Sequence, residues 1–371
     1  MAKILIVGNP QSPLVRARGL VGQHAGHQIF WFSAYPINLA GVNSLTLPQF
    51  ARYSFLLRAF LEPLYLSRVL KEVNPDIVHV HYASKGLAAL PLARRHPLMV
   101  TAMGSDILPE VGYKLPYSPF TRKLLNAADL ITSKSNFMDD ALLEVGDYAP
   151  KIRRITWGID LRHFQPKRDV RPLRIKWQIP EKNIVFFDPR SATPFYNKHL
   201  TLKAFAGYLA SGGLKATLLV AELGAKPGYV EELKDLSIQL GIKDQLRFIG
   251  TVKHEEMADY YALSDITISI PPSDGLPQSI YEALACGSFL IMNDLPAYQE
   301  VVEDGVTAKL VPPGNIGALE AAMLWVTEHR EVRQKAKGLG RKYVEKYADQ
   351  AEQTKRVNQL YAELLEAKTH A

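Results

Sequence analysis

The chain of 371 residues carries a net charge of +7, with 47% hydrophobic and 22% charged residues, which suits two domains because single hydrophobic cores stop growing near ~250–300 residues. Its apolar runs fall short of the ~18 residues that a membrane span needs, and the run from Ile4 to Gly8 is too short for a secretory signal. The single cysteine, Cys286, excludes an internal disulfide and fits a reducing compartment.

Short β-branched runs alternate with longer amphipathic stretches in the first half of the chain. This alternation predicts βα units, and therefore an α/β fold with a parallel sheet covered by helices on both faces. The expected strands are Lys3–Val7, Gln28–Ser33, Ile77–His81, Leu98–Ala102, Leu130–Ser133 and Ile152–Trp157.

The alternation stops between Phe164 and Pro180, a stretch rich in Pro and Arg that we interpret as a linker and a lead-in helix. It then restarts and predicts a second doubly wound sheet, whereas residues from Asn315 onward are expected to be helical. The expected strands are Ile184–Asp188, Ala216–Ala221, Leu246–Gly250, Ile266–Ile270, Phe289–Asn293 and Ala308–Val311.

These patterns predict a domain at residues 1–165, a second domain at 166–350, and a terminal helix at 351–371 that packs back on the first domain. Residues 1–169 contain 20 Lys and Arg against 12 Asp and Glu, so the first half carries essentially all of the excess positive charge. A basic half suits nucleic acid, an anionic membrane or an anionic substrate, and it is equally consistent with an ordinary basic surface.

The segment from Pro271 to Gly287 combines several features of an anion-binding site. It follows an expected strand, turns through Asp274-Gly275, begins a helix with Pro277 near the first position and ends it at Gly287. The N-terminus of such a helix offers amides and a positive dipole to a diphosphate. The eight-residue step from Asp274 to Glu282 brings two carboxylates to one site, although a capped helix with a solvated polar face would give the same pattern.

This segment resembles the signature of retaining glycosyltransferases of the GT-B fold, particularly glycosyltransferase family 4. The signature has two acidic residues separated by seven positions, with Glu-Ala-(Met/Leu)-Ala-(Cys/x)-Gly at the second, and Asp274 and Glu282 to Gly287 match it. The usual first residue is Glu, so Asp274 is a shorter variant. The resemblance implies two Rossmann-like domains facing across a cleft, with the nucleotide-sugar donor held by the second and the acceptor by the first.

The resemblance also implies residue roles in donor binding. Glu282 would hold the ribose hydroxyls and Asp274 the donor sugar. Arg190, at a strand end, and Lys198, at the start of the next helix, would neutralise the diphosphate leaving group in place of a metal ion. The other expected donor contacts are Gly275, Leu276, Gln278 and Ser279.

The turn Met103-Gly104-Ser105-Asp106 departs from the family pattern, because many relatives carry His at the position of Met103. By the resemblance, Met103 and Gly104 lie near the transferred sugar, but methionine cannot donate the hydrogen bond of that histidine. Asp106 is expected to orient the acceptor hydroxyl, although it could equally cap the next helix.

His79 and His81 share one face of an expected strand, as two metal ligands would. A third ligand with suitable spacing is not apparent, so we expect neither a metal nor another cofactor. His79 is interpreted as a core residue with its hydrogen bonds satisfied, and His81 as a residue placed to contact the acceptor.

The resemblance predicts a metal-independent, retaining transferase that uses a nucleotide diphosphate sugar, with UDP-sugars favoured, and a glycan, lipid-linked or small-molecule acceptor. Two alternatives remain: a nucleotide-sugar-binding protein or partner subunit without activity, and a sugar-nucleotide epimerase. Nucleic acid is not an expected partner, because the sequence contains no recognisable nucleic-acid-binding module.

The segment from Phe50 to Leu70 intersperses arginines with aromatic residues. We interpret the aromatics as core and the arginines as a solvated face. The alternative is peripheral contact of the basic first domain with an anionic membrane carrying a lipid-linked glycan. The expected location is cytoplasmic, at the inner face of the membrane if that contact is made.

Overall fold

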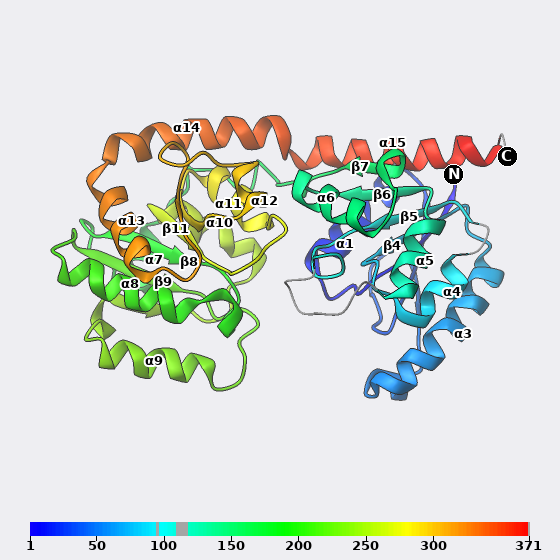
Figure 1. Cartoon of the computed structure of the whole chain (residues 1–371), viewed down its shortest axis with the longest axis horizontal. Helices are drawn as coiled ribbons and strands as arrows, with labels where there is room; N and C mark the ends of the chain where they lie inside the picture. Colours follow the sequence, from blue (N-terminus) through cyan, green and yellow to red (C-terminus); the bar gives the residue numbers. More distant parts are fainter. Residues whose placement is uncertain (94–95, 109–117, 370–371) are drawn as a thin grey trace. The chain divides into compact units, whose positions relative to one another are not determined.

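The chain forms two compact units, one of Met1–Gly158 with Ala351–Ala371 and one of Ile159–Gln350 (Figure 1). The computed structural model describes residues 1–93, 96–108 and 118–369, with side chains for all of these except residues 368 and 369. Each unit contains one parallel sheet with helices on both faces, so the predicted α/β class with two Rossmann-like domains is confirmed.

The first unit has a seven-stranded sheet in the order β3-β2-β1-β4-β5-β6-β7, and each neighbouring pair is parallel. Its strands are β1 (Lys3–Val7), β2 (Gln28–Ser33), β3 (Val42–Thr46), β4 (Ile77–His81), β5 (Leu98–Thr101), β6 (Leu130–Ser133) and β7 (Ile152–Arg154). Its helices are α1 (Pro13–Gly19), α2 (Val21–His24), α3 (Phe55–Val73), α4 (Ala89–Leu92), α5 (Pro119–Ala127), α6 (Asn136–Val145) and α15 (Gln350–Thr369), with the 3-10 helices η1 (Gln49–Arg52), η2 (Gly86–Ala88) and η4 (Ala149–Lys151).

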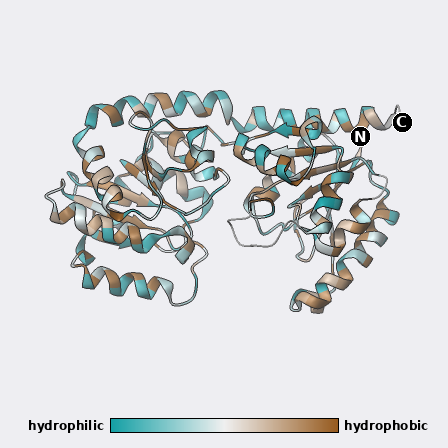
Figure 2. Cartoon of the chain, viewed as in Figure 1, coloured by the Kyte–Doolittle hydropathy of each residue, from teal (hydrophilic) through white to brown (hydrophobic). Residues whose placement is uncertain are grey.

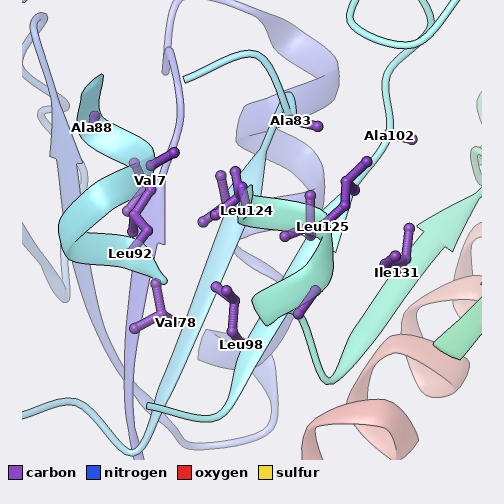
Figure 3. Close-up of a cluster of buried hydrophobic side chains, with 14 of the residues drawn as sticks. Val7, Val78, Ala83, Ala88, Leu92, Leu98, Ala102, Leu124, Leu125 and Ile131 are labelled. Carbon is purple, nitrogen blue, oxygen red and sulfur yellow. The ribbon is translucent and has the colours of Figure 1, made fainter. Parts of the chain in front are cut away.

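Alternating strand residues of the first sheet build two separate cores. Leu5 and Val7 of β1 join the core under α3 to α6, part of which Figure 3 shows around Leu124 and Leu125. Ile4 and Ile6 point to the opposite face and pack with α1, α2 and α15. The terminal helix α15 therefore contributes Tyr361 and its neighbours to the core of the first unit.

The second unit has a six-stranded parallel sheet in the order β10-β9-β8-β11-β12-β13. Its strands are β8 (Ile184–Asp188), β9 (Ala216–Val220), β10 (Leu246–Phe248), β11 (Ile266–Ser269), β12 (Phe289–Asn293) and β13 (Ala308–Val311). Its helices are α7 (Arg171–Lys176), α8 (Lys198–Ala210), α9 (Tyr229–Gln239), α10 (His254–Leu263), α11 (Gln278–Cys286), α12 (Pro296–Gln299), α13 (Ile316–Glu328) and α14 (Arg330–Tyr347), with the 3-10 helices η5 (Pro194–Tyr196) and η6 (Lys243–Gln245).

Strand β8 shows how this sheet is anchored between two helical layers. Phe186 packs edge-on against Phe205 and Tyr208 of α8, whereas Phe187 contacts Tyr260 and Tyr261 of α10 on the other face. Burying one such side chain stabilises a fold by about 1.5–3 kcal/mol. The hydrophobic strands and the mixed colouring of the outer helices in Figure 2 follow from this arrangement.

Several sequence expectations need correction. Strand β3 was not predicted, because Val42–Thr46 is a polar, partly exposed edge strand that lacks a continuous apolar run. Five strands end one to three residues earlier than predicted: β5, β7, β9, β10 and β11. The core assignment of the aromatics between Phe50 and Leu70 is wrong for Tyr53, Phe55 and Phe60, which are exposed.

Candidate functional site

The strand order of the second sheet reverses between β8 and β11, since β9 and β10 extend the sheet on one side and β12 and β13 on the other. In open parallel sheets, ligands bind beyond the carboxyl ends of the strands at such a switch point. β8 ends at Asp188 and β11 at Ser269. Residues that follow these two positions are therefore the candidates for a binding site.

Arg190 lies just beyond β8 and is the centre of a polar cluster. Its Nη2 atom donates a hydrogen bond to Asp274 Oδ2 at 2.8 Å, and its Nη1 atom donates to Ser279 Oγ at 3.3 Å and Ser269 Oγ at 3.5 Å. The guanidinium carbon lies 4.5 Å from the ring centroid of Tyr196. Burial lowers the pKa of Arg190, but Asp274, Tyr298 and Tyr196 together raise it by more, so the net pKa is raised and the guanidinium remains charged.

Asp274 is held by two groups from distant parts of the second unit. Besides Arg190, the buried hydroxyl of Tyr298 donates a hydrogen bond to Asp274 Oδ2 at 3.2 Å. The side chains of Arg190 and Asp274 are only 11% and 13% exposed. Water therefore screens this ion pair less than it would screen a pair on the surface. The carboxylate that was predicted to hold the donor sugar is thus also a partner of the arginine that was predicted to bind the diphosphate.

Lys198 begins α8, as predicted, but its ammonium group is fully buried. Lys198 Nζ lies 2.5 Å from Asp188 Oδ1 and donates a second hydrogen bond to the backbone carbonyl of Asp188 at 3.1 Å. Asp188 Oδ1 also accepts the backbone amide of Arg190 at 3.2 Å. Burial lowers the pKa of Lys198, and the attraction of Asp188 opposes that shift. In this conformation Lys198 therefore fixes the turn that carries Arg190.

Glu282 lies on α11, and its side chain is almost completely buried. Burial raises the pKa of Glu282 to about 7, and the opposing effects of Tyr261 and Arg190 offset this shift only in part. His254 Nδ1 lies 3.9 Å from Glu282 Oε1. Glu282 can therefore exchange a proton near neutral pH, and it lies close enough to Arg190 for the two charges to interact.

The loop between β11 and α11 is fixed by side-chain amides at its start. Asn197 Nδ2 donates to the carbonyl of Ile270 at 2.9 Å, and Asn293 Nδ2 donates to the carbonyl of Pro271 at 2.7 Å. Further along, Leu276 has φ of 77°, a left-handed conformation that costs about 1–3 kcal/mol in a residue other than glycine. The side chain of Leu276 is buried, and its packing holds the backbone in this strained conformation.

Helix α11 begins at Gln278, so Pro277 is the N-cap residue rather than the first helical residue. Pro277 provides no side-chain cap for the amides of the first turn. The helix ends at Gly287, as predicted, with φ of 78°. Gly275 is buried in the preceding loop, and Gln278 and Ser279 are half-buried. The predicted donor contacts thus lie around one helix N-terminus, of which Ser279 directly contacts Arg190.

In the first unit, the carboxylate of Asp106 accepts three backbone amides. Asp106 Oδ1 accepts from Met103 at 2.9 Å and Gly104 at 2.8 Å, and Oδ2 accepts from Ala83 at 2.6 Å. Burial raises the pKa of Asp106, and these amides oppose the shift. This geometry favours a role in positioning the turn over the direct contact with the acceptor hydroxyl that the sequence suggested. Met103 is buried beside the turn.

His79 donates or accepts hydrogen bonds at both ring nitrogens, with Tyr361 Oη at 2.7 Å and Thr101 Oγ1 at 2.8 Å, so its interpretation as a satisfied core residue is confirmed. Within the part of the chain that the structure describes, both ring nitrogens of His81 are buried without a hydrogen-bond partner. Burial lowers the pKa of His81 well below its ordinary value. Tyr82 follows with φ of 68°, so this strand end is strained as well.

The structure brings together Arg190, Asp274 and Ser279 by direct contacts, and it places Lys198 and Glu282 near them in the same unit. Met103, Gly104 and Asp106 belong to the other unit. Sequence reasoning missed the partners of this cluster: Asp188, Tyr196, Tyr261, Ser269 and Tyr298. Of these, only Asp188 had a local signal, since a carboxylate at the end of a buried strand needs a partner.

Cys286 is buried on α11, and burial raises the pKa of its thiol to about 12, so the reactive thiolate form is disfavoured. Among the described residues, there is no group of three or more His, Cys, Asp or Glu arranged to hold a metal ion. The helices within the described ranges also include none that is both long and apolar enough to cross a bilayer.

Comparison with known proteins gives two family matches that together span most of the chain. Residues 169–343 match the family described as "Glycosyl transferases group 1". Residues 17–163 match the family described as "Glycosyltransferase Family 4". The two matches fall on the two halves of the chain that the sequence analysis assigned to donor and acceptor.

Individual relatives are distant. The N-acetyl-alpha-D-glucosaminyl L-malate synthase of Bacillus anthracis is 24% identical over 356 residues, which cover 90% of this chain and 91% of that protein. The D-inositol 3-phosphate glycosyltransferase of Geodermatophilus obscurus is 27% identical over 273 residues, but the match spans only 60% of that protein and 69% of this chain. The structure of Anabaena HepE with UDP and glucose superposes with a TM-score of 0.78 at 18% identity, covering 98% of this chain and 100% of that one, which shows a common fold.

Proposed function

Because the chain belongs to the glycosyl transferases group 1, with a family 4 glycosyltransferase region before it, we propose that it transfers a sugar from a nucleotide diphosphate sugar with retention of configuration and without a metal ion. UDP-sugars are the favoured donors, and the HepE complex with UDP and glucose supports that choice. The acceptor is a glycan, a lipid-linked molecule or a small molecule.

The observation that carries this proposal is the position of Arg190 at the switch point of the second sheet. Its guanidinium lies next to Ser279, in the first turn of α11, so a fixed cation and the positive end of a helix dipole adjoin each other. A diphosphate binds well where these two features coincide. Glu282, four residues into the same helix, is placed to accept hydrogen bonds from ribose hydroxyls.

In the proposed reaction, the bond between the anomeric carbon and the diphosphate oxygen breaks while the acceptor oxygen bonds to that carbon from the same face. The acceptor hydroxyl gives its proton to the departing phosphate oxygen. Negative charge grows on the nucleoside diphosphate in the transition state, and a cation already in place stabilises it without reorganisation. Arg190 supplies that cation in our proposal.

Lys198 adds positive charge to the same site from within the unit. Its ammonium group is bound to Asp188 in this structure, so direct contact with the diphosphate requires it to leave that carboxylate. In the observed conformation it supports catalysis by holding Asp188, which in turn fixes the backbone of Arg190. Arg190 and Lys198 are thus proposed to have different tasks within one cationic site.

The test begins with thermal unfolding of the whole chain in the presence of UDP-, GDP- and ADP-sugars, because a ligand that binds only the folded state raises the melting temperature. The best donor is then used to measure release of nucleoside diphosphate with and without EDTA. We expect Arg190→Ala to lower the rate by about 10²–10³, the loss typical of removing one group that stabilises transition-state charge. Arg171→Ala, which removes an exposed arginine of the same unit, is the matched control.

A second variant, Arg190→Lys, separates charge from geometry, since lysine keeps the charge but loses the forked hydrogen bonds to Asp274 and Ser279. Full activity of the double variant Arg190→Ala with Lys198→Ala would overturn the assigned roles. Donor binding without release of nucleoside diphosphate across an acceptor panel would identify a binding protein instead. Recovery of an epimerised donor without transfer would identify an epimerase.

A further inference from the structure

Exposed hydrophobic side chains gather on η1 and the first half of α3 in the first unit. Seven large apolar side chains of this surface are between 46% and 83% exposed. In Figure 1 this half of α3 extends beyond the rest of its own unit, and Figure 2 shows it largely in hydrophobic colours. We name it the η1–α3 surface, and its apolar members are Phe50, Tyr53, Phe55, Leu56, Leu57, Phe60 and Leu64.

The η1–α3 surface is not simply the edge of the hydrophobic core. The buried residues of α3 are confined to its second half: Leu66, Val69, Leu70 and Val73. With 3.6 residues per turn, the stripe formed by Leu56, Leu57, Phe60 and Leu64 is centred roughly 145° away from that buried stripe. These four side chains therefore point away from the face that the second half buries, whereas Phe55 is exposed at the first turn of the helix, outside this stripe.

Positive charge continues the same face. On the helical wheel, Lys71 falls within the exposed stripe and Arg68 lies at its edge, one to two turns beyond Leu64. Both are exposed. Arg68 pairs with Glu72 at 2.6 Å. Solvent screens such an exposed ion pair, so the pair contributes little to the stability of the helix. Arg58 lies nearer the apolar end, with its guanidinium carbon 5.9 Å from the ring centroid of Phe55.

The acidic residue within the apolar half is turned away from this face. Glu62 is half-buried, and burial raises its pKa, with Lys85 and Arg58 as the charges that oppose the shift. The exposed face is therefore an apolar tip of aromatic and leucine side chains followed by basic residues. An interfacial helix has this composition, because its apolar side chains enter the boundary of the acyl chains while cations contact anionic headgroups.

We propose that the η1–α3 surface binds the surface of an anionic lipid bilayer. The proposal concerns a contact made without a donor or an acceptor, so it does not depend on the sugar-transfer reaction. The excess positive charge of residues 1–169, with 20 Lys and Arg against 12 Asp and Glu, favours the same partner at longer range.

The experiment measures sedimentation of the whole chain with vesicles in the absence of nucleotide sugars. One vesicle preparation contains phosphatidylcholine with about one third phosphatidylglycerol, whose anionic headgroups attract basic residues, and the other contains phosphatidylcholine alone. We expect clear binding to the anionic vesicles, weaker binding when salt is raised, and little binding to the neutral ones.

Two paired variants separate the apolar from the electrostatic contribution. The double variant Phe55→Gln with Phe60→Gln removes two apolar side chains, while glutamine itself favours the helix. Binding to the vesicles should therefore fall at least tenfold. Arg68→Gln with Lys71→Gln should weaken binding to anionic vesicles at least fivefold and reduce its salt dependence. Leu143→Gln with Leu339→Gln removes exposed leucines elsewhere and should leave binding unchanged.

Melting temperatures and circular dichroism show whether each variant is folded. Equal binding by the wild type and a folded Phe55→Gln, Phe60→Gln variant would overturn the proposal, as would the absence of vesicle binding by the wild type. Sedimentation velocity adds a further outcome: a wild-type dimer that this variant dissociates, without vesicle binding, would assign the surface to a second copy of the chain and contradict the lipid proposal.

Discussion

The buried carboxyl group of Glu282 predicts how the stability of the fold changes with pH, in both direction and magnitude. Its pKa is raised from an ordinary 4.5 to about 7 by burial, so the folded state holds the proton more tightly than the unfolded state. As pH rises from 4.5, the unfolded chain ionises first and gains stability relative to the folded chain. The folded state therefore loses stability until pH passes about 7, by about 3 kcal/mol at about 1.36 kcal/mol per pKa unit.

Glu282→Gln removes this titration while keeping the size of the side chain. We expect the free energy of unfolding of the variant to improve relative to the wild type by up to about 3 kcal/mol between pH 4.5 and pH 8. Hydrogen exchange of α11 peptides across this pH range measures the change in the second unit itself. Glu256→Gln, an exposed position on α10, is the control. Parallel pH dependence of wild type and Glu282→Gln would refute the reasoning.

Three further changes test buried polar contacts through urea unfolding of the whole chain. Lys198→Met leaves Asp188 charged and unpaired, so we expect a loss of about 3–5 kcal/mol, and adding Asp188→Asn should recover part of it; strictly additive losses would contradict a coupled pair. Tyr361→Phe removes a partner of His79 and should cost about 1–3 kcal/mol, whereas no change would mean that water replaces the hydroxyl. Asp106→Ala leaves three backbone amides without their acceptor and should lower the free energy of unfolding by about 3 kcal/mol. Asp106→Asn should have a free energy of unfolding between those of Asp106→Ala and the wild type.

The ion pair between Arg190 and Asp274 also changes how the two residues should be interpreted. Sequence comparison treats the acidic residue as a contact for the donor sugar, but here it also orients the guanidinium. In the proposed reaction, replacing Asp274 would therefore perturb the cation assigned to the leaving group as well as the expected contact with the sugar. A matched measurement on Asp274→Asn and Arg190→Lys should show coupled losses in nucleoside diphosphate release, because groups that act through one hydrogen-bonded pair are not additive.

The sequence by itself determined the elements and their class. The alternation of apolar runs and amphipathic stretches predicted twelve of the strands at or near their observed positions, because local periodicity depends on residues close together in the chain. It also placed the end of α11 at Gly287, where a left-handed φ favours glycine. The edge strand β3 gave no such signal, since only its pairing with β2 shows that it is a strand.

The tertiary structure alone decided which side chains meet. Arg190 contacts Asp274 across 84 positions of sequence, and Tyr298 reaches the same carboxylate from α12. Burial of Lys198 against Asp188 follows from helix α8 packing on the sheet, and the amphipathic pattern of that helix does not reveal it. Exposure of Phe55 and Phe60 likewise could not be read from their hydrophobicity. Such outcomes depend on long-range packing, which residue type and spacing leave undetermined.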